Sequence, residues 1–315
     1  MTKPLFSICI PTFNRCVYLQ NTLKAIVSQP EFLDGRVEVI ISDNASDDNT
    51  PAVCSEYAKK YPNFHYYRNT RNVIDENFPL ALSRGNGILR RLSNDTYIHD
   101  NGTLAAFCNL VEKYKESKPL IFFTDAYKKN VKNGVLPFHE FVVQVSYMVT
   151  WVGGFSVWED ECDGIEKDTD ACQLRLWHVR KAFDLGYKKD ACVVFNNRMG
   201  YTQQIKNRDM SYGLYQVFYK NFLSLLKPYI DNGSLTLKEY EFLRRDLLYN
   251  FLTTRIIDWE LQREKIKYTE KEDLKKLVFD EYKDDSYWNV YQLFYTKRVI
   301  KRKVKMFLRK LVGRE

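Results

Sequence analysis

The sequence predicts an α/β fold with a mostly parallel, doubly wound sheet, followed by a helical C-terminal region. Short apolar segments rich in β-formers alternate with helical patterns from residue 5 to residue 123, which favours a parallel sheet. Nearly all of the chain beyond residue 168 has helical periodicity. Polar residues follow several of the predicted strands, at the edge where such sheets bind ligands.

The predicted strands and helices alternate regularly in the first part of the chain. The run LFSICI at 5–10 is closed by Pro11, and a helical pattern with apolar residues at i, i+4, i+7 and i+8 follows it. Thr50-Pro51 is a typical helix start, with proline at the first helical position. Further strands are expected at 37–42, 64–69, 87–95 and 119–123, and further helices at 77–84 and 103–116.

The composition of the chain changes from about Tyr147, where YMVTWVGGFSVWEDECDG is aromatic-rich and lacks regular periodicity. Beyond it, helices are expected at 170–185, 213–230, 236–264 and 270–283.

Composition restricts the class of protein. The 315 residues are 45% hydrophobic and 15% aromatic, which is enough for a packed core. No run of about 18 apolar residues exists, so no membrane-spanning helix is predicted. Seven cysteines without a C-x-x-C pair, and an N-terminus unlike a signal peptide, favour reduced thiols in a cytoplasmic protein.

The net charge of +8 belongs to the C-terminal tail. Residues 297–315 hold nine basic residues and one acidic residue, which alone give +8, so the preceding chain is neutral. Ile300, Val304, Phe307, Leu308 and Leu311 lie on one helical face of this tail, a pattern typical of helices on an anionic membrane surface. A terminal helix docked on the body is the alternative. A neutral body without a recognised motif argues against nucleic acid as a partner.

The ends of three strands predict a shared cleft. Thr12 and Asn14 follow the first strand, Asp43 follows the second and Asp95 ends the fourth. A carboxylate can accept the N–H groups of a nucleotide base, and another can hold a hard cation on phosphate oxygens. The first strand is followed by PTFNR, with neither a dinucleotide fingerprint nor a Walker loop. These residues therefore fit a nucleotide diphosphate.

Three segments together resemble the nucleotide-binding half of family 2 glycosyltransferases with the GT-A fold: FSICIPTFNR, VEVIISDNASDDNT and LRRLSNDT. The resemblance covers residues 5–125 well. It continues more loosely through TWVGGFSVW and GYTQQIKNRDMSYGLYQVFYKNFL, which look like bacterial O-antigen and capsule sugar transferases. It implies a GT-A domain over 1–210, with a nucleotide-binding half at 1–125 and an acceptor half at 126–210. A helical region over 211–296 and the basic tail over 297–315 would follow.

The resemblance also implies roles for particular residues. Asp43 matches the acidic residue that reads the base, commonly uracil, and Asp95 matches the last carboxylate of the D-x-D motif, which holds Mn²⁺ or Mg²⁺. The sequence departs from that motif at Ser93, so metal independence is an open alternative. Asp43 as a turn cap and Asp95 as a turn residue are the structural alternatives. The donor-binding residues implied are Pro11, Thr12, Asn14, Asp43, Asn94 and Asp95.

An inverting transfer needs a carboxylate that takes the proton of the acceptor hydroxyl. The stretch EDECDGIEKDTDACQLRLW offers several, of which Asp170 is preferred because it is expected to open a helix, with Asp168 and Asp160 next. Trp151 and Trp158 are candidates for stacking on an acceptor sugar, although buried aromatic residues usually belong to the core.

The sequence thus predicts an inverting glycosyltransferase for bacterial surface polysaccharide (O-antigen or capsule). Its partners would be a nucleotide-sugar donor, UDP-linked, a lipid-linked saccharide acceptor and the inner face of the cell membrane. A sugar nucleotidyltransferase is the enzyme alternative, but PTFNR lacks the glycine-rich basic loop it would need. A catalytically inactive scaffold at the membrane is the other alternative, because Ser93 replaces an aspartate.

Overall fold

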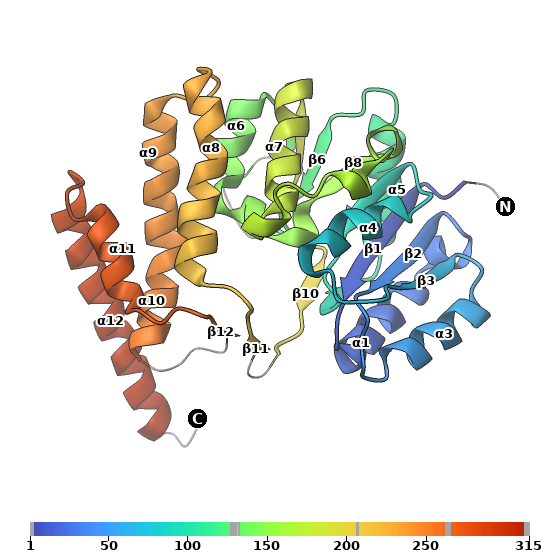
Figure 1. Ribbon diagram of the computed structural model, residues 1–315, viewed down its shortest axis with the longest axis horizontal. Helices are drawn as coiled ribbons and strands as arrows, with labels where there is room; N and C mark the ends of the chain where they lie inside the picture. The colour runs from blue at the N-terminus through green and yellow to red at the C-terminus, as the bar shows by residue number, and fades with distance from the viewer. Residues whose placement is uncertain (1–2, 127–130, 132, 206–207, 262–265, 312–315) are drawn as a thin grey trace. The chain divides into compact units, whose positions relative to one another are not determined.

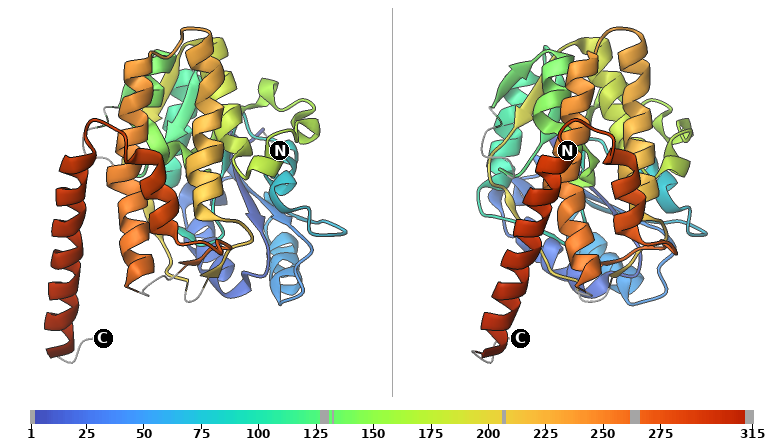
Figure 2. Two further views of the ribbon diagram at one scale, coloured as in Figure 1. Left: turned by 60° about the vertical axis from the view of Figure 1, so that its left-hand side comes forward. Right: turned by 90° about the vertical axis from the view of Figure 1, so that its left-hand side faces the viewer.

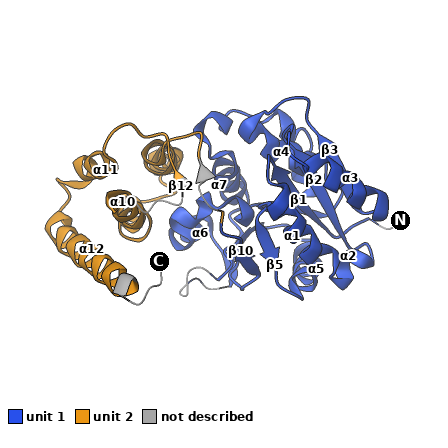
Figure 3. Cartoon of the chain, turned by 90° about the horizontal axis from the view of Figure 1, so that it is seen from below, with its two compact units in different colours: residues 1–204 blue, residues 205–315 orange. Residues whose placement is uncertain are grey.

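The computed structural model describes residues 3–126, 131, 133–205, 208–261 and 266–311. The chain forms two compact units, residues 1–204 and 205–315, which Figure 3 colours separately. The two units meet between Gln204 and Ile205. The sequence predicted this domain boundary slightly later, at residue 210.

The main sheet of unit 1 has five strands in the order β3-β2-β1-β4-β8. The first four are parallel, and β8 runs antiparallel to β4, so the prediction of a mostly parallel sheet is confirmed. The order reverses at β1, which has β2 on one side and β4 on the other, and sheets of this kind bind ligands at such a point. The strands are β1 (Phe6–Thr12), β2 (Val37–Asp43), β3 (Phe64–Arg68), β4 (Leu89–Leu92) and β8 (Ser156–Trp158).

Helices cover both faces of this sheet, as Figure 1 shows. Phe6, Ile8 and Ile10 alternate along β1 and enter the main hydrophobic core, which residues of α1 and α5 complete. On the other face, α4 packs against β1, β2 and β4. The helices are α1 (Cys16–Val27), α2 (Pro30–Leu33), α3 (Thr50–Lys60), α4 (Asn77–Ser83) and α5 (Thr103–Tyr114).

A smaller sheet and a two-stranded ribbon contain the other strands of unit 1 that the structure describes. The smaller sheet has the order β6-β9-β7, and the ribbon pairs β5 with β10. Gly200 of β10 is required there, because a Cβ atom at this position would lie 1.9 Å from the carbonyl oxygen of Ile98 in β5. The bounds are β5 (Tyr97–His99), β6 (Leu120–Phe123), β7 (Gly134–Leu136), β9 (Cys192–Phe195), β10 (Gly200–Thr202), α6 (Phe138–Val145) and α7 (Trp177–Lys189).

The predicted helix at 170–185 is wrong at its start. Residues Cys172–Leu174 form a 3₁₀ turn and α7 begins only at Trp177. Arg175 has φ of +61°, a left-handed conformation that interrupts an α-helix. Asp170 therefore lies in a turn ahead of α7 and does not open the helix.

Over its described residues, unit 2 is helical apart from one short pair of strands, β11 (Arg208–Asp209) and β12 (Ile266–Lys267). A capping box between Thr236 and Glu239 starts α9, and a π-helical turn joins α9 to α10. None of the helices in the described ranges combines the length and apolar composition that crossing a bilayer requires. The helices are α8 (Phe222–Asp231), α9 (Leu237–Asp246), α10 (Thr253–Glu260), α11 (Leu274–Tyr282) and α12 (Trp288–Leu311).

All seven cysteines carry free thiols and are buried. Burial raises the pKa of Cys54 and of Cys192 to about 12, and that of Cys108 to about 11. These thiols are therefore protonated at neutral pH and pack as small apolar groups.

Candidate active site

The polar ends of β1, β2 and β4 lie together at the carboxyl edge of the main sheet. Thr12 is the register partner of Asp43 across β1 and β2. On its other side, the Thr12 hydroxyl donates a hydrogen bond of 2.9 Å to Oδ2 of Asp95, which follows β4. Thr12 thus lies between the two carboxylates, at the point where the strand order reverses.

Asp43 is completely buried, and both of its carboxylate oxygens accept hydrogen bonds. Oδ1 accepts the amide of Ser46 at 2.9 Å and Oδ2 accepts the hydroxyl of Tyr66 at 2.8 Å. Burial, together with the hydrogen bond to Asp43, raises the pKa of Tyr66 above its usual value. The Arg68 guanidinium lies 3.7 Å from the same carboxylate and remains half exposed. Asp43 anchors the turn after β2, and a nucleotide base would have to displace one of these donors or share a carboxylate oxygen with it.

Asn14 connects the loops that follow β1 and β2. Its backbone amide donates to Oγ of Ser46, and its side-chain oxygen accepts the amide of Asp47, both at 2.9 Å. Asn14 has φ of +51°, a conformation in which asparagine is more frequent than most residues. Pro11 and Asn94, also predicted to bind the donor, are half-buried at the same edge.

Asp48 fixes the start of α1. Its carboxylate accepts the amides of Cys16 and Thr50, both at 2.9 Å. Burial opposes ionisation of this group, but the hydrogen bonds outweigh it and the pKa of Asp48 is lowered. Asp48 therefore has a structural role, since it holds the amides at the starts of α1 and α3.

A cavity of about 650 Å³ adjoins this edge. The side chain of Asn44, the residue after Asp43, accepts the amide of Val73, a lining residue of the cavity, at 2.8 Å, and it also donates to Oδ1 of Asn72 at 2.7 Å. Pockets of several hundred Å³ are the size that small ligands occupy. The walls are two loops, with lining residues Val73, Ile74, Asp75, Glu76, Thr169, Asp170, Cys172, Gln173 and Arg175.

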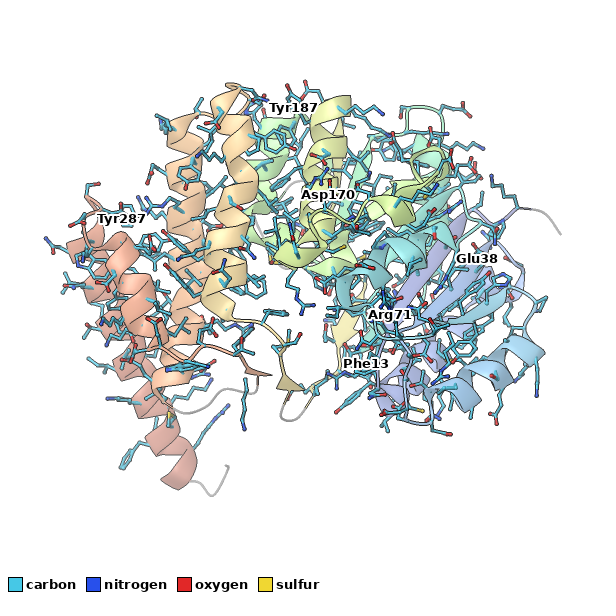
Figure 4. The ribbon with its side chains drawn as sticks, in the orientation of Figure 1. Phe13, Glu38, Arg71, Asp170, Tyr187 and Tyr287 are labelled. Atoms are coloured by element: carbon cyan, nitrogen blue, oxygen red, sulfur yellow. The ribbon has the colours of Figure 1, made fainter. Side chains whose placement is uncertain are left out.

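Asp170 lines this cavity, and Asp168 lies beside it. The Asp170 side chain is 88% exposed, and its nearest cation is Arg180 at 3.7 Å; Figure 4 labels the residue on the loop before α7. Asp168 is 23% exposed and accepts a 3.0 Å hydrogen bond from Nζ of Lys181. Asp170 is the more accessible of the two carboxylates, although not because it opens a helix.

One pair of functional candidates was missed by the sequence analysis. Asp75 and Arg175, which both line the cavity, form an ion pair of 3.0 Å, and both side chains are largely buried. Burial raises the pKa of Asp75, while the Arg175 charge partly lowers it. A carboxyl group with a raised pKa in a cleft is a common feature of active sites. No local motif marks either residue, because the pair joins segments 100 positions apart.

Two predicted site residues lie elsewhere. Asp160 follows β8, whose last residue pairs with Leu89 at the start of β4, so Asp160 lies at the sheet edge opposite Asp95, where it pairs with Lys118 at 3.2 Å. Trp158 is 2% exposed and donates its indole N–H to the Pro119 carbonyl. The structure therefore corrects both predictions: neither residue can reach a substrate at the carboxyl edge.

Trp151 is half-buried, with its ring 5.7 Å from that of Tyr97. It packs against the main hydrophobic core, and its contact with an acceptor stays a prediction.

Arg90 and Arg91 point to opposite faces of β4, as strand alternation predicts. Arg90 donates to the Leu82 carbonyl at the end of α4. Arg91 is completely buried, stacks over Phe123 and donates from Nε to the Gly153 carbonyl. Burial lowers the pKa of Arg91 to about 10. Both arginines are structural.

Asp95 is the predicted metal ligand. Within the described residues, no group of three or more His, Cys, Asp or Glu side chains is arranged to hold a metal ion. A single carboxylate beside a hydroxyl suits a cation such as Mg²⁺ that takes its remaining ligands from phosphates and water. The residues present thus fit a cation brought by a diphosphate, and do not form an all-protein metal cage.

Known structures define the class of fold. Staphylococcus aureus TarS, residues 1–349 in complex with UDP-GlcNAc, matches with a TM-score of 0.58 over 95% of this chain and 91% of that one, at 15% identity. The Pyrobaculum calidifontis mannosyltransferase PcManGT, in complex with GDP-Man and Mn²⁺, matches with a TM-score of 0.53 over 97% of this chain and 87% of that one, at 14% identity. The fold is GT-A, as the sequence predicted.

The family follows from the sequence. Residues 7–143 match the family model described as glycosyl transferase family 2, so this part of the chain belongs to that family. The abequosyltransferase RfbV of Salmonella typhimurium is 44% identical over 87 residues, which are 26% of this chain and 25% of RfbV. The GalNAc(5)-diNAcBac-PP-undecaprenol beta-1,3-glucosyltransferase of Campylobacter jejuni is 31% identical over 123 residues, which are 38% and 37% of the two chains. The chain thus spans well under half the length of these curated relatives.

Proposed function

We propose that this protein is an inverting glycosyltransferase that moves a sugar from a nucleotide-diphosphate donor, UDP-linked, to a lipid-linked saccharide in the assembly of a bacterial O-antigen or capsule. The observation that carries the proposal is one continuous edge. The Thr12–Asp95 bond, the Asp43 turn and the cavity beside Asn44 follow one another along it. The family match over 7–143 and the name of RfbV support sugar transfer, and the name of the Campylobacter enzyme supports a lipid-linked saccharide acceptor.

The donor would lie along this edge. Asp43 would accept an N–H group of the base, after Tyr66 or Ser46 yields its place, and Thr12 and Asn14 would border the nucleoside. Asp95 would face the diphosphate. A divalent cation, Mn²⁺ or Mg²⁺, would neutralise charge that builds up on the departing diphosphate. UDP-GlcNAc in the TarS complex and GDP-Man in the PcManGT complex support a nucleotide-sugar donor.

Asp170 would act as the base, with Asp168 as the second candidate. The acceptor hydroxyl gives its proton to the carboxylate as its oxygen bonds to the anomeric carbon, and the bond from that carbon to the diphosphate oxygen breaks. Attack opposite the leaving group inverts the anomeric configuration. The exposure of Asp170 and its place in the cavity wall support this choice. Asp168 is less accessible, because its side chain is 23% exposed and its carboxylate is held by Lys181 at 3.0 Å.

We also propose that the protein works at the cytoplasmic face of the membrane, attached through the tail at 297–315. The apolar and basic faces of α12 support this, and a lipid-linked acceptor would make such attachment useful.

The test compares aspartates that differ in position. Asp95→Asn and Asp170→Asn should each lower transfer from a nucleotide sugar by about 100-fold or more, the range typical for a lost acid–base or charge-stabilising group. Asp160→Asn, at the opposite edge, is the matched control and should keep wild-type activity. Thermal shift with nucleotide diphosphates, with and without Mn²⁺, reports the donor and the metal separately from turnover.

Several outcomes decide between the alternatives. Donor binding without any transfer by the wild type would favour the inactive scaffold. Full activity in Asp170→Asn with loss in Asp168→Asn would move the base to Asp168. A product that keeps the donor's anomeric configuration, read by NMR, would contradict inversion.

A further inference from the structure

A groove in unit 2 lies between α10 and α12 and has a volume of about 400 Å³. Four of its lining residues are cations of α12 spaced at i, i+3, i+4 and i+7, so they share one face of the helix. Asp258 is the one acidic residue that lines it. The lining residues are Thr254, Ile257, Asp258, Phe294, Arg298, Lys301, Arg302 and Lys305.

The two arginines are held in place and the two lysines are not. Arg302 donates to Oδ1 of Asp258 at 2.7 Å. Arg298 donates to Oγ1 of Thr254 at 3.4 Å, and its guanidinium lies 5.4 Å from the ring centre of Phe294. Lys301 and Lys305 are exposed and form no ion pair with the described residues. With four cations and one carboxylate, the groove has a surplus of three positive charges.

An exposed apolar stripe lies on the neighbouring face of α12. Ile300, Val304, Phe307 and Leu308 have between 51% and 63% of their surface exposed. In both views of Figure 2, the C-terminal part of α12 extends beyond the ends of the other helices of unit 2. A helix with an apolar stripe beside a basic face is suited to lie in a membrane interface, with the stripe among the acyl chains and the cations at headgroup depth.

We propose that this groove binds the phosphate headgroup of a membrane lipid, and that it prefers a phosphomonoester or diphosphate to a phosphodiester. A phosphomonoester carries about −1.5 to −2 charges at pH 7, whereas a phosphodiester carries one. The surplus of three positive charges and the forked arginines favour the more highly charged group. The adjoining stripe commits the occupant to a lipid, because its chains would enter the membrane beside Val304. The inference rests on the proposed membrane attachment through 297–315 and adds a headgroup preference to it, and it holds whether or not the chain is an active transferase.

The test uses the full-length chain and two vesicle compositions of equal surface charge. One contains phosphatidic acid, a phosphomonoester, and the other contains phosphatidylglycerol, a phosphodiester, each in phosphatidylcholine. The wild type should bind the first several-fold more tightly in co-sedimentation. The variant Lys301→Gln/Lys305→Gln, which lacks the free cations of the groove, should bind both vesicles equally.

A matched control separates the groove from general charge. Lys297→Gln/Lys303→Gln removes two exposed lysines of the same helix that do not line the groove. Each lysine near an anionic surface is worth about fivefold in affinity, so both double variants should bind phosphatidylglycerol vesicles about 25-fold more weakly. Only the control should keep the preference for phosphatidic acid.

Three results would overturn the proposal. The first is a wild type that binds the two vesicles with equal affinity. The second is an equal loss of the preference for phosphatidic acid in both double variants. Groove-dependent binding of inorganic pyrophosphate in solution, without any preference among vesicles, would assign the site to a soluble phosphate and not to a lipid. Unchanged melting temperatures of the variants would show that they fold.

Discussion

Asp43 has the turn-capping role that was one of its two predicted alternatives, and its contact with a nucleotide base stays a prediction. Its carboxylate fixes the turn after β2 through the Ser46 amide, as a capping residue would. It also lies beside Thr12 at the edge where the strand order reverses. The position of Asp43 could be predicted because a strand pattern ends there. Its complete burial could not, because the covering Tyr66 and Arg68 come from β3.

His178 is a residue whose burial has a measurable consequence. Burial lowers its pKa to about 4, and its Nε2 lies 3.0 Å from the Thr150 carbonyl. The unfolded chain therefore takes up a proton near pH 6.5, while the folded protein takes it up only near pH 4. The free energy of unfolding must fall as pH is lowered through this window, by about 3 kcal/mol from this group.

We expect His178→Gln to remove that contribution while a side-chain N–H still reaches the Thr150 carbonyl. Urea unfolding between pH 6.5 and pH 4 should show the stability difference between wild type and variant changing by about 3 kcal/mol. Other buried groups, including His99, affect both proteins alike and cancel in the difference. Parallel pH profiles would contradict the assignment.

At the scale of elements, the ribbon of β5 and β10 supports the site because β5 begins two residues after Asp95. Gly200→Ala would place a methyl group against the Ile98 carbonyl and force the strands apart. Overpacking of this kind costs typically about 1–3 kcal/mol, so a clear fall in melting temperature is expected, with weaker nucleotide binding. Tyr201→Ala is the control, because Tyr201 is exposed in the same strand and its loss should change stability little. If Gly200→Ala kept the wild-type melting temperature and nucleotide binding, β5 and β10 would tolerate being forced apart.

The elements that the sequence predicted well are those with strong periodicity. The strands β1, β2, β3 and β6 and the helices α1, α3 and α5 lie within a few residues of their predicted places. The strands between 134 and 202 were not predicted, because they have three or four residues each, too few for alternation to be recognised. The start of α7 was misplaced since the apolar spacing through Leu174 continues across a 3₁₀ turn, and only the positive φ of Arg175 stops the helix.

At the scale of the whole molecule, the sequence predicted which strand ends meet but not what completes the cavity. Thr12 and Asp95 meet because parallel strands end at one edge, a general property of the fold. Asp75 and Arg175 meet because the loop before α7 folds back over the start of α4, and no local pattern encodes that return. Trp158 shows the converse: an aromatic residue in an irregular segment suggested a sugar platform, and the packing of two sheets put it in the core.

The seven buried thiols should not react with a maleimide, because maleimides react with accessible thiolates. We expect the native protein at pH 7 to take up no label, and Val304→Cys, on the exposed stripe of α12, to take up one, as counted by mass spectrometry. Stoichiometric labelling of the wild type would contradict the burial of its cysteines. A dye attached at this single position would report polarity and immersion depth on the native sequence background, so the moment at which the tail leaves water could be watched directly.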